Sequence, residues 1–317
     1  MQHNTFIGSV KDPVEQFFVF MLERQNIYLK KMRGDPHPLT EDSILQKYKF
    51  TNVYREQDRT TLWMRENVRN KFIGKPEVFL ATVVFRWFNK IDTGDVIFNQ
   101  KNDFVTPFEY FLHTGNGRDL EHNIRNRMPN GKWVTGAYII TSKTGMDKLA
   151  GICSIIEDFY HGKFPSEFEF FYDKPVNWRG LAESLLDHRG KYTLWSVWNW
   201  LSQVPFQGTF HSYENVTDLR HTALLDKAPD IYTWANAGPG AVRGLNRIFG
   251  YDLNQKMRPE NSLKGMLYLL EKSKEIWPND TDFPPLEARD IEHSLCEYDK
   301  YMRVWHNEGA PRSLYKK

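Results

Sequence analysis

The chain has 317 residues, 40% of them hydrophobic, so it is long enough to bury a sizeable core in one large or two medium domains. Its 42 basic residues nearly balance its 40 acidic residues, and a net charge of +2 excludes a strongly basic surface overall. Any surface that binds nucleic acid must therefore be local. The two cysteines lie far apart, which argues against a disulfide framework, and neither a secretion signal nor a membrane span is recognisable. We expect a cytoplasmic protein.

Three helices are predicted in the N-terminal part. Asp12, Pro13 and Glu15 form the pattern of an N-cap, a first helical position and a capping box. A second helix is predicted over residues 40–48, and a third begins at residue 52 and runs toward residue 68. In the third helix, a charged start and an apolar continuation would share one face, through Arg55, Asp58, Arg59 and Leu62.

Residues 76–90 are apolar on nearly every face, a pattern typical of a helix that is buried all round. The segment ends with Arg86 and Asn89, which lie three residues apart on one helix face. A buried charge without a partner is costly, so these side chains either have partners in the core or mark a helix end that emerges into solvent. The sequence leaves both readings open.

The rest of the chain is also predicted to be mostly helical. Thr106, Pro107 and Glu109 repeat the helix-start signal, and residues 133–141 contain β-formers after a turn. Further helices are predicted over residues 146–159, 192–201, 209–221, 262–277 and 287–304. The predicted fold class is mainly α, a multi-helix globular fold. We expect one helical domain over residues 1–317, with a candidate subdivision near residues 160–176.

A glycine-rich turn near residue 238 is a candidate anion site. Gly238 and Gly240 flank Pro239, and the amides that follow would point outward at a helix N-terminus. Arg243 and Arg247 lie four residues apart on the predicted helix and would carry positive charge toward a phosphate. The alternative is that Gly-Pro-Gly forms only a turn.

Common catalytic motifs are missing from the sequence. It contains no GxxxxGKS/T loop, no GxGxxG after a strand, no HExxH and no GxSxG. His293 and Cys296 have a spacing that metal ligands use, but no other ligands are evident nearby, so we expect no metal and no cofactor. Several arginines instead stand beside an acid or an amide, an arrangement that suits either a phosphate-bearing ligand with a general base or structural ion pairs.

Five blocks, in order, resemble one family. They are FTNVYREQDRT (50–60), FRWFN (85–89), FQGTFHSYENVTDLR (206–220), GPGAVRGL (238–245) and DIEHSLCEYDK (290–300). Together they resemble the α-glutamyl/putrescinyl thymine pyrophosphorylase family, the amino acid:DNA transferases of bacteriophage thymidine hypermodification. This family shares its helical domain with the 5-hydroxymethyluracil DNA kinases. The kinases carry an additional nucleotide-binding loop that this sequence lacks, so the resemblance implies a transferase.

The resemblance implies a fold distantly similar to helix-hairpin-helix DNA glycosylases, with residues 204–208 as the hairpin. Pro239 and Gly240 stand where a glycosylase would carry its catalytic aspartate, which argues against glycosidic-bond cleavage. The implied substrates are double-stranded DNA with a modified thymine and an amino acid or polyamine. The thymine would be flipped out of the duplex, its phosphate replaced by the amine, and the product would help the bacteriophage evade restriction.

Roles for individual residues follow from this mechanism. Arg55, Arg86 and Arg243, with the turn at Gly238 and Gly240, would hold the phosphate. The amine's proton would pass to Asp218 or, as a second choice, to Asp58. Asn52, Tyr54 and Asn89 would contact the base, and Glu292 and Glu297 would instead attract the positive charge of the amine. The alternatives are a non-catalytic DNA-binding module beside a separate kinase, and a DNA glycosylase.

Overall fold

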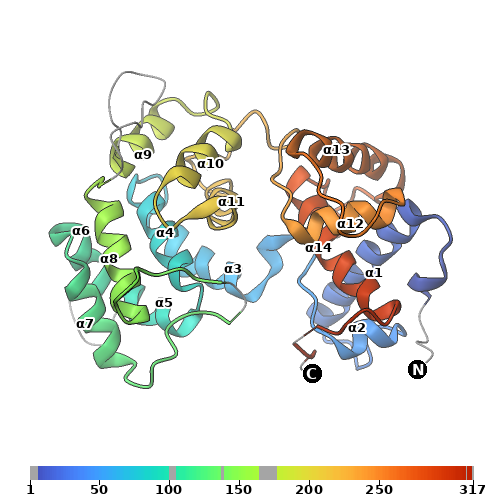
Figure 1. Ribbon diagram of the computed structural model, residues 1–317, viewed down its shortest axis with the longest axis horizontal. Coiled ribbons are helices and arrows are strands. Elements are labelled where there is room, and N and C mark those ends of the chain that lie inside the picture. Colours follow the sequence, from blue (N-terminus) through green and yellow to red (C-terminus); the bar gives the residue numbers. More distant parts are fainter. Residues whose placement is uncertain (1–5, 100–104, 137–138, 164–176, 312, 316–317) are drawn as a thin grey trace. The chain divides into compact units, whose positions relative to one another are not determined.

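The computed structural model describes residues 6–99, 105–136, 139–163, 177–311 and 313–315, which belong to two compact units (Figure 1). Unit 1 contains residues 1–58 and 231–317, and unit 2 contains residues 59–230. The described residues are mainly helical, with one isolated antiparallel bridge between Tyr48 and Leu314, which confirms the predicted fold class. One functional domain over residues 1–317 stays a prediction. Most of its candidate subdivision lies outside the described residues.

Unit 1 is built around a close contact between two helices, α12 (Pro239–Phe249) and α14 (Ala288–Trp305). A Cβ atom on Gly244 would lie 2.5 Å from the carbonyl oxygen of Leu295, so glycine lets the two backbones approach. α1 (Pro13–Arg33) contacts α12, α13 and α14. The unit also contains α2 (Ser43–Lys47), α13 (Pro259–Ile276) and the 3-10 turns Ile7–Ser9 and Arg55–Gln57.

Unit 2 surrounds the apolar helix α4 (Glu77–Phe88), in which every residue from Val78 to Phe88 is buried. α4 contacts α5 (Ile91–Phe98), α8 (Lys148–Tyr160), α9 (Trp178–Asp187) and α11 (Gly208–Leu219). The remaining elements are α3 (Arg59–Met64), the π-helical turn Arg65–Arg69, α6 (Pro107–Thr114), α7 (Gly117–Arg127) and α10 (Leu194–Gln203). None of the helices in the described part of the chain has the length and apolar character needed to cross a bilayer.

Local capping signals explain where several helices begin. The Asp12 carboxylate accepts a hydrogen bond from the Glu15 amide at 2.8 Å, and Pro13 occupies the first turn. Thr106 and Glu109 form a complete capping box at the start of α6. These starts were predicted because an N-cap depends only on residues three positions apart.

One local prediction is corrected. The chain does not continue as one helix from residue 52: Tyr54 and Asp58 have extended backbone angles, and α3 begins only at Arg59. The Asp58 carboxylate accepts a hydrogen bond from the Asn52 amide at 3.0 Å, which holds the intervening residues as a loop. The described residues of 133–141 form no strand. Thr135 instead donates its amide to the carbonyl of Phe88 at 2.9 Å.

Candidate functional site

A buried ion pair joins α4 to α11 in unit 2. Arg86 donates from Nη2 to Asp218 Oδ1 at 2.9 Å and from Nε to Asp218 Oδ2. Its third donor, Nη1, reaches Asn89 Oδ1 at 2.6 Å. The side chains of Arg86 and Asp218 are only 2% and 0% exposed. Of the two readings that the sequence left open, the structure supports partners in the core.

The segment of α11 that carries Asp218 contains polar side chains although it is buried. Every residue from His211 to Leu219 is buried, and the ring of His211 meets that of Trp87 edge-on with centroids 4.5 Å apart. Burial lowers the pKa of His211 to about 4, so the imidazole is neutral at physiological pH. In the described structure His211 Nε2, Ser212 Oγ and Trp87 Nε1 are buried without a hydrogen-bond partner. Burying such groups lowers the stability of the fold unless a ligand or water forms a hydrogen bond with them.

A second cluster, which we call the Asp58 cluster, lies in unit 1 on the loop that precedes α3. Asn52 donates its amide to Asp58 Oδ1, and its side chain donates to the carbonyl of Gln57 at 2.8 Å. Arg24 on α1 supports the same loop by donating to the carbonyls of Thr51 and Asn52 at 2.7 and 2.9 Å. The loop therefore holds the Asp58 carboxylate in one place.

The Asp58 carboxyl has a perturbed acidity. Burial raises its pKa to about 6, and this effect outweighs the opposing Asn52 hydrogen bond and the positive charges of Arg55 and Arg24. Glu297 adds a smaller repulsion in the same direction as burial. A carboxyl with this pKa is ionised at neutral pH and still basic enough to accept a proton during a reaction.

Two other predicted residues near this loop are already engaged. Tyr54 donates its hydroxyl to the carbonyl of Pro284 at 2.5 Å and accepts from Trp277 Nε1 at 3.0 Å. Glu297 Oε2 accepts from the Thr51 amide at 3.1 Å and from Lys300 Nζ at 2.6 Å. In this conformation both side chains support the loop.

A third cluster, the Asp299 cluster, lies where α12 meets α14. Arg243 and Arg247 each donate from Nε to one oxygen of Asp299, both at 2.9 Å. Arg247 is 7% exposed and also pairs with Glu308 at 2.5 Å, whereas Arg243 is 37% exposed. The Nη groups of Arg243 have no acceptor in the described part of the chain. Arg243 is thus the arginine of this cluster that is available to an anion.

The glycine-rich turn forms the start of α12, with Gly238 as N-cap. The Gly238 amide donates to Glu292 Oε1 at 3.3 Å, and Arg289 holds the other oxygen of Glu292 at 2.5 Å. A Cβ on Gly240 would lie 3.1 Å from Cys296 Sγ, so this glycine also serves helix packing. A carboxylate thus already occupies one amide of the predicted anion site, where the helix dipole favours negative charge.

The predicted residues therefore fall into separate groups. Arg86, Asn89 and Asp218 meet in unit 2, whereas Asn52, Asp58 and Glu297 support one loop in unit 1. Sequence reasoning missed Arg24 and Asp299, which organise the Asp58 and Asp299 clusters. Arg24 interrupts an otherwise apolar helix face, which is the signal that singled out Arg86. Asp299 lies within the fifth sequence block, and no neighbouring residue there points to its role. No group of three His, Cys, Asp or Glu side chains in the described residues is arranged to hold a metal.

Known proteins match nearly the whole length of this chain. The profile of the family described as "5-hmdU DNA kinase, helical domain" matches residues 11–310. The 5-hmdU DNA kinase of Bacillus phage SP10 is 26% identical over 313 residues, which cover 93% of this chain and 45% of that relative. The chain thus spans less than half the length of the curated relative that it matches, and no solved structure matches it. Because the profile covers both units, the chain belongs to the family of 5-hmdU DNA kinase helical domains.

Proposed function

We propose that this protein modifies thymine in DNA by replacing the phosphate of 5-phosphomethyluracil with an amine, either an amino acid or a polyamine. Three findings support the proposal: membership of the helical-domain family, the five sequence blocks similar to amino acid:DNA transferases, and the Asp58 carboxyl. We assign it the amine transfer rather than the phosphorylation because the five blocks resemble the amino acid:DNA transferases.

The proposed reaction depends on the Asp58 carboxyl. The amine nitrogen attacks the exocyclic carbon of the thymine, a C–N bond forms, and the C–O bond breaks as phosphate leaves with its electron pair. The ammonium formed in this step must lose a proton, and the Asp58 carboxylate, with a pKa of about 6, accepts it. Asp218 is the second candidate for this role. Both of its oxygens are already bonded to Arg86, which favours a positioning role for that pair.

Arg243 is our candidate for binding the phosphate. It is anchored through Nε to Asp299, and its Nη groups are the paired donors that recognise phosphate oxygens well. The turn at Gly238 and Gly240 begins the same helix, so its positive dipole end lies on the element that carries Arg243. Arg55, which is buried beside Asp58, adds positive charge at the general base.

Access to the exocyclic carbon requires the thymine to leave the duplex. The α10–α11 hairpin, with positive φ angles at Phe206 and Gly208, supports the proposed distant likeness to helix-hairpin-helix proteins. In this proposal Asn52 and Tyr54, both in unit 1, contact the base, and Glu292 and Glu297 attract the amine. The modified major groove would protect bacteriophage DNA from host nucleases.

One observation favours a second function. The chain corresponds to 45% of a kinase, so it is also a candidate for a DNA-binding module that works beside separate kinase residues. This function requires DNA binding but no product from this chain.

The deciding experiment incubates the protein with duplex DNA that contains 5-phosphomethyluracil and with a panel of amino acids and polyamines. Nucleosides are then identified by mass spectrometry, and released phosphate is measured. Asp58→Asn is the matched variant, because an asparagine oxygen can still accept the Asn52 hydrogen bond. Duplexes with thymine or 5-hydroxymethyluracil are the substrate controls.

An amine adduct that forms with wild-type protein and is lost in Asp58→Asn supports the transferase. DNA binding that survives both Asp218→Asn and Arg243→Ala, with no adduct and no released phosphate from any variant or the wild type, identifies the binding module instead. Abasic sites in 5-hydroxymethyluracil DNA would indicate a glycosylase and contradict the transfer reaction.

A further inference from the structure

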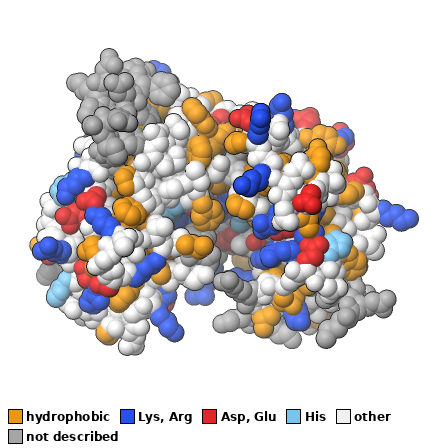
Figure 2. All heavy atoms as spheres, in the orientation of Figure 1, with side chains coloured by type: hydrophobic (Ala, Val, Ile, Leu, Met, Phe, Trp, Pro, Cys, Tyr) orange, Lys and Arg blue, Asp and Glu red, His pale blue; other side chains and the backbone are white. Residues whose placement is uncertain are grey.

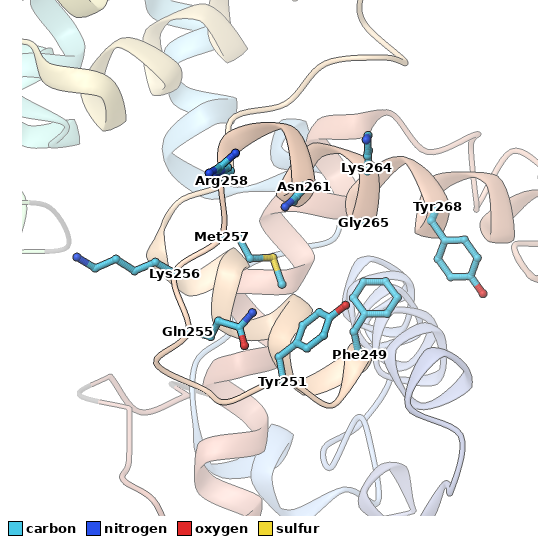
Figure 3. A pocket seen from close by; sticks show the side chains of 10 residues that line it. All are labelled: Phe249, Tyr251, Gln255, Lys256, Met257, Arg258, Asn261, Lys264, Gly265 and Tyr268. Atoms are coloured by element: carbon cyan, nitrogen blue, oxygen red, sulfur yellow. The ribbon is translucent and has the colours of Figure 1, made fainter.

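A pocket of about 660 Å³ lies in unit 1, and no residue of the Asp58 cluster lines it (Figure 3). It is formed by the end of α12, the loop over residues 250–258 and the first half of α13. Its volume is within the range of about 300–1,000 Å³ that is usual for small-molecule sites.

Aromatic rings form one part of the pocket. Phe249 lies between Tyr251 and Tyr268, with ring centroids 6.4 and 5.9 Å away. Tyr251 and Tyr268 are 50% and 46% exposed, and Figure 3 shows the Tyr251 ring beside that of Phe249. A Cβ on Gly265 would lie 3.1 Å from the Phe249 ring, so a glycine at this position lets the ring seat against α13. The result is a partly exposed aromatic surface.

Basic side chains form the other part. Lys256, Arg258 and Lys264 line the pocket, and no acidic residue does. In the described part of the chain no ion pair is recorded for any of these three cations. Figure 3 shows Arg258 beside Asn261 at the start of α13, while Lys256 extends away from the other side chains.

This concentration of charge is local. The whole chain has a net charge of +2, and on the face shown in Figure 2 basic side chains are scattered among acidic ones. Three cations at one pocket without an acid therefore attract an anion to this place specifically. Salt would weaken the attraction, because the cations are exposed.

We propose that this pocket binds a nucleotide, with the base against Phe249, Tyr251 and Tyr268 and the phosphate against Arg258 and Lys264. Aromatic surfaces stack with any base, and lysine or arginine binds the phosphate without reading sequence. The amides of Gln255 and Asn261, which also line the pocket, can donate to and accept from a base edge. An acidic peptide would satisfy the cations but would leave the aromatic surface without a partner.

The nucleotide comes either from a DNA strand or from a free mononucleotide. Both have the same chemistry at this pocket, and the experiment separates them. The inference goes beyond the amine transfer, because it concerns binding alone and requires neither a modified base nor an amine. Binding can therefore fail while transfer succeeds, and the reverse also holds.

The test titrates the full chain into a fluorescein-labelled single-stranded DNA 12-mer and follows fluorescence anisotropy at several salt concentrations. Calorimetry with unlabelled dTMP provides the mononucleotide arm. One variant reverses charge at the pocket, Arg258→Glu with Lys264→Glu, and a second removes the stacking surface, Tyr251→Ala with Tyr268→Ala. The matched control, Lys31→Glu with Lys274→Glu, makes the same charge change at exposed positions outside the pocket. All altered side chains are exposed, and circular dichroism checks that each variant is folded.

Charge reversal should weaken binding of the 12-mer at least about tenfold. It should also reduce the slope of log K against log salt by the equivalent of about one to two released counterions. Loss of the two tyrosines should weaken binding about tenfold with an unchanged salt dependence. If dTMP binds and the pocket variants lose it while 12-mer binding is unaffected, the source is a free nucleotide. The proposal is overturned if wild type binds neither ligand, if both pocket variants bind both ligands like wild type, or if the control variant weakens binding equally. It is also overturned if a polyglutamate peptide competes with the 12-mer equally well before and after loss of the tyrosines.

Discussion

Arg86 binds both carboxylate oxygens of Asp218, with the Nη2–Oδ1 distance at 2.9 Å, although the two residues lie 132 positions apart in the chain. Asn89 accepts the third hydrogen bond of the guanidinium at 2.6 Å. Because the pair is buried, each charge depends on the other, and removal of one leaves a buried charge that water cannot reach.

We therefore expect Asp218→Asn to lower the free energy of unfolding by about 3–5 kcal/mol, since Arg86 would keep an unpaired charge in the core. Urea unfolding followed by circular dichroism measures this loss. The control is the double variant Arg86→Met with Asp218→Leu, which removes both charges. Its loss of unfolding free energy should be smaller than the losses of the single variants Arg86→Met and Asp218→Leu added together. Losses that simply add would show that the two charges do not depend on each other.

The Asp58 carboxyl predicts a pH dependence of stability. Its folded-state pKa of about 6 lies above the ordinary value of 3.8, so the folded protein holds this proton more tightly than the unfolded chain. The stabilising contribution is therefore fully present below about pH 4 and is lost as the pH rises through 6. Asp58→Asn should flatten this part of the profile, measured as the difference in unfolding free energy between variant and wild type from pH 4 to 8.

The same group predicts a pH dependence of the proposed reaction. The rate of amine transfer should rise through about pH 6 and then level off, because only the ionised carboxyl accepts a proton. Asp58→Asn should lower the rate about 10²- to 10⁴-fold and abolish the rise. Asp42→Asn is the matched control: burial also raises the pKa of Asp42, but this residue caps α2 and accepts from Tyr301. A rate that follows pH equally in wild type and Asp58→Asn would exclude Asp58 as the base.

Arg243 and Arg247 provide a matched pair of arginines on one helix. Arg243→Ala should lower kcat/KM for the 5-phosphomethyluracil substrate about 10- to 100-fold, the loss expected for a charged hydrogen bond to phosphate, with little change in stability. Arg247→Ala should instead lower the unfolding free energy by about 2–3 kcal/mol, because its buried side chain holds Asp299 and Glu308. Steady-state kinetics and urea unfolding of both variants check this division. Equal effects on both measurements would contradict it.

Gly244 should tolerate no side chain. Gly244→Ala places a Cβ 2.5 Å from the Leu295 carbonyl oxygen, so α12 and α14 must move apart, and we expect a loss of about 1–3 kcal/mol. Gly136→Ala is the control, because among the described residues a Cβ there meets no atom within 4 Å. Thermal unfolding of the two variants measures the difference. A stable Gly244→Ala protein would show that this helix contact is not tightly packed.

Much of the secondary structure could be predicted because its causes are local. The Asp12 and Thr106 caps involve hydrogen bonds between residues three positions apart, and the apolar pattern of 76–90 predicted the buried helix α4. The predicted helix from residue 52 was wrong because the Asp58 side chain accepts a hydrogen bond from the upstream Asn52 amide and stabilises a loop. Periodicity alone does not report such a competing hydrogen bond.

Local sequence signals were enough to predict a mainly α fold, the main helix starts, the family blocks and the residue types suited to phosphate and proton chemistry. The tertiary structure was needed to show that Arg86 pairs with Asp218 and that burial raises the pKa of Asp58 to about 6. It also shows that Asp299 accepts from both Arg243 and Arg247, while in the described residues the Nη groups of Arg243 have no acceptor. The division has one physical reason. Helix capping and periodicity depend on neighbouring residues, whereas burial and ion pairing depend on which distant segments the fold brings within a few ångströms.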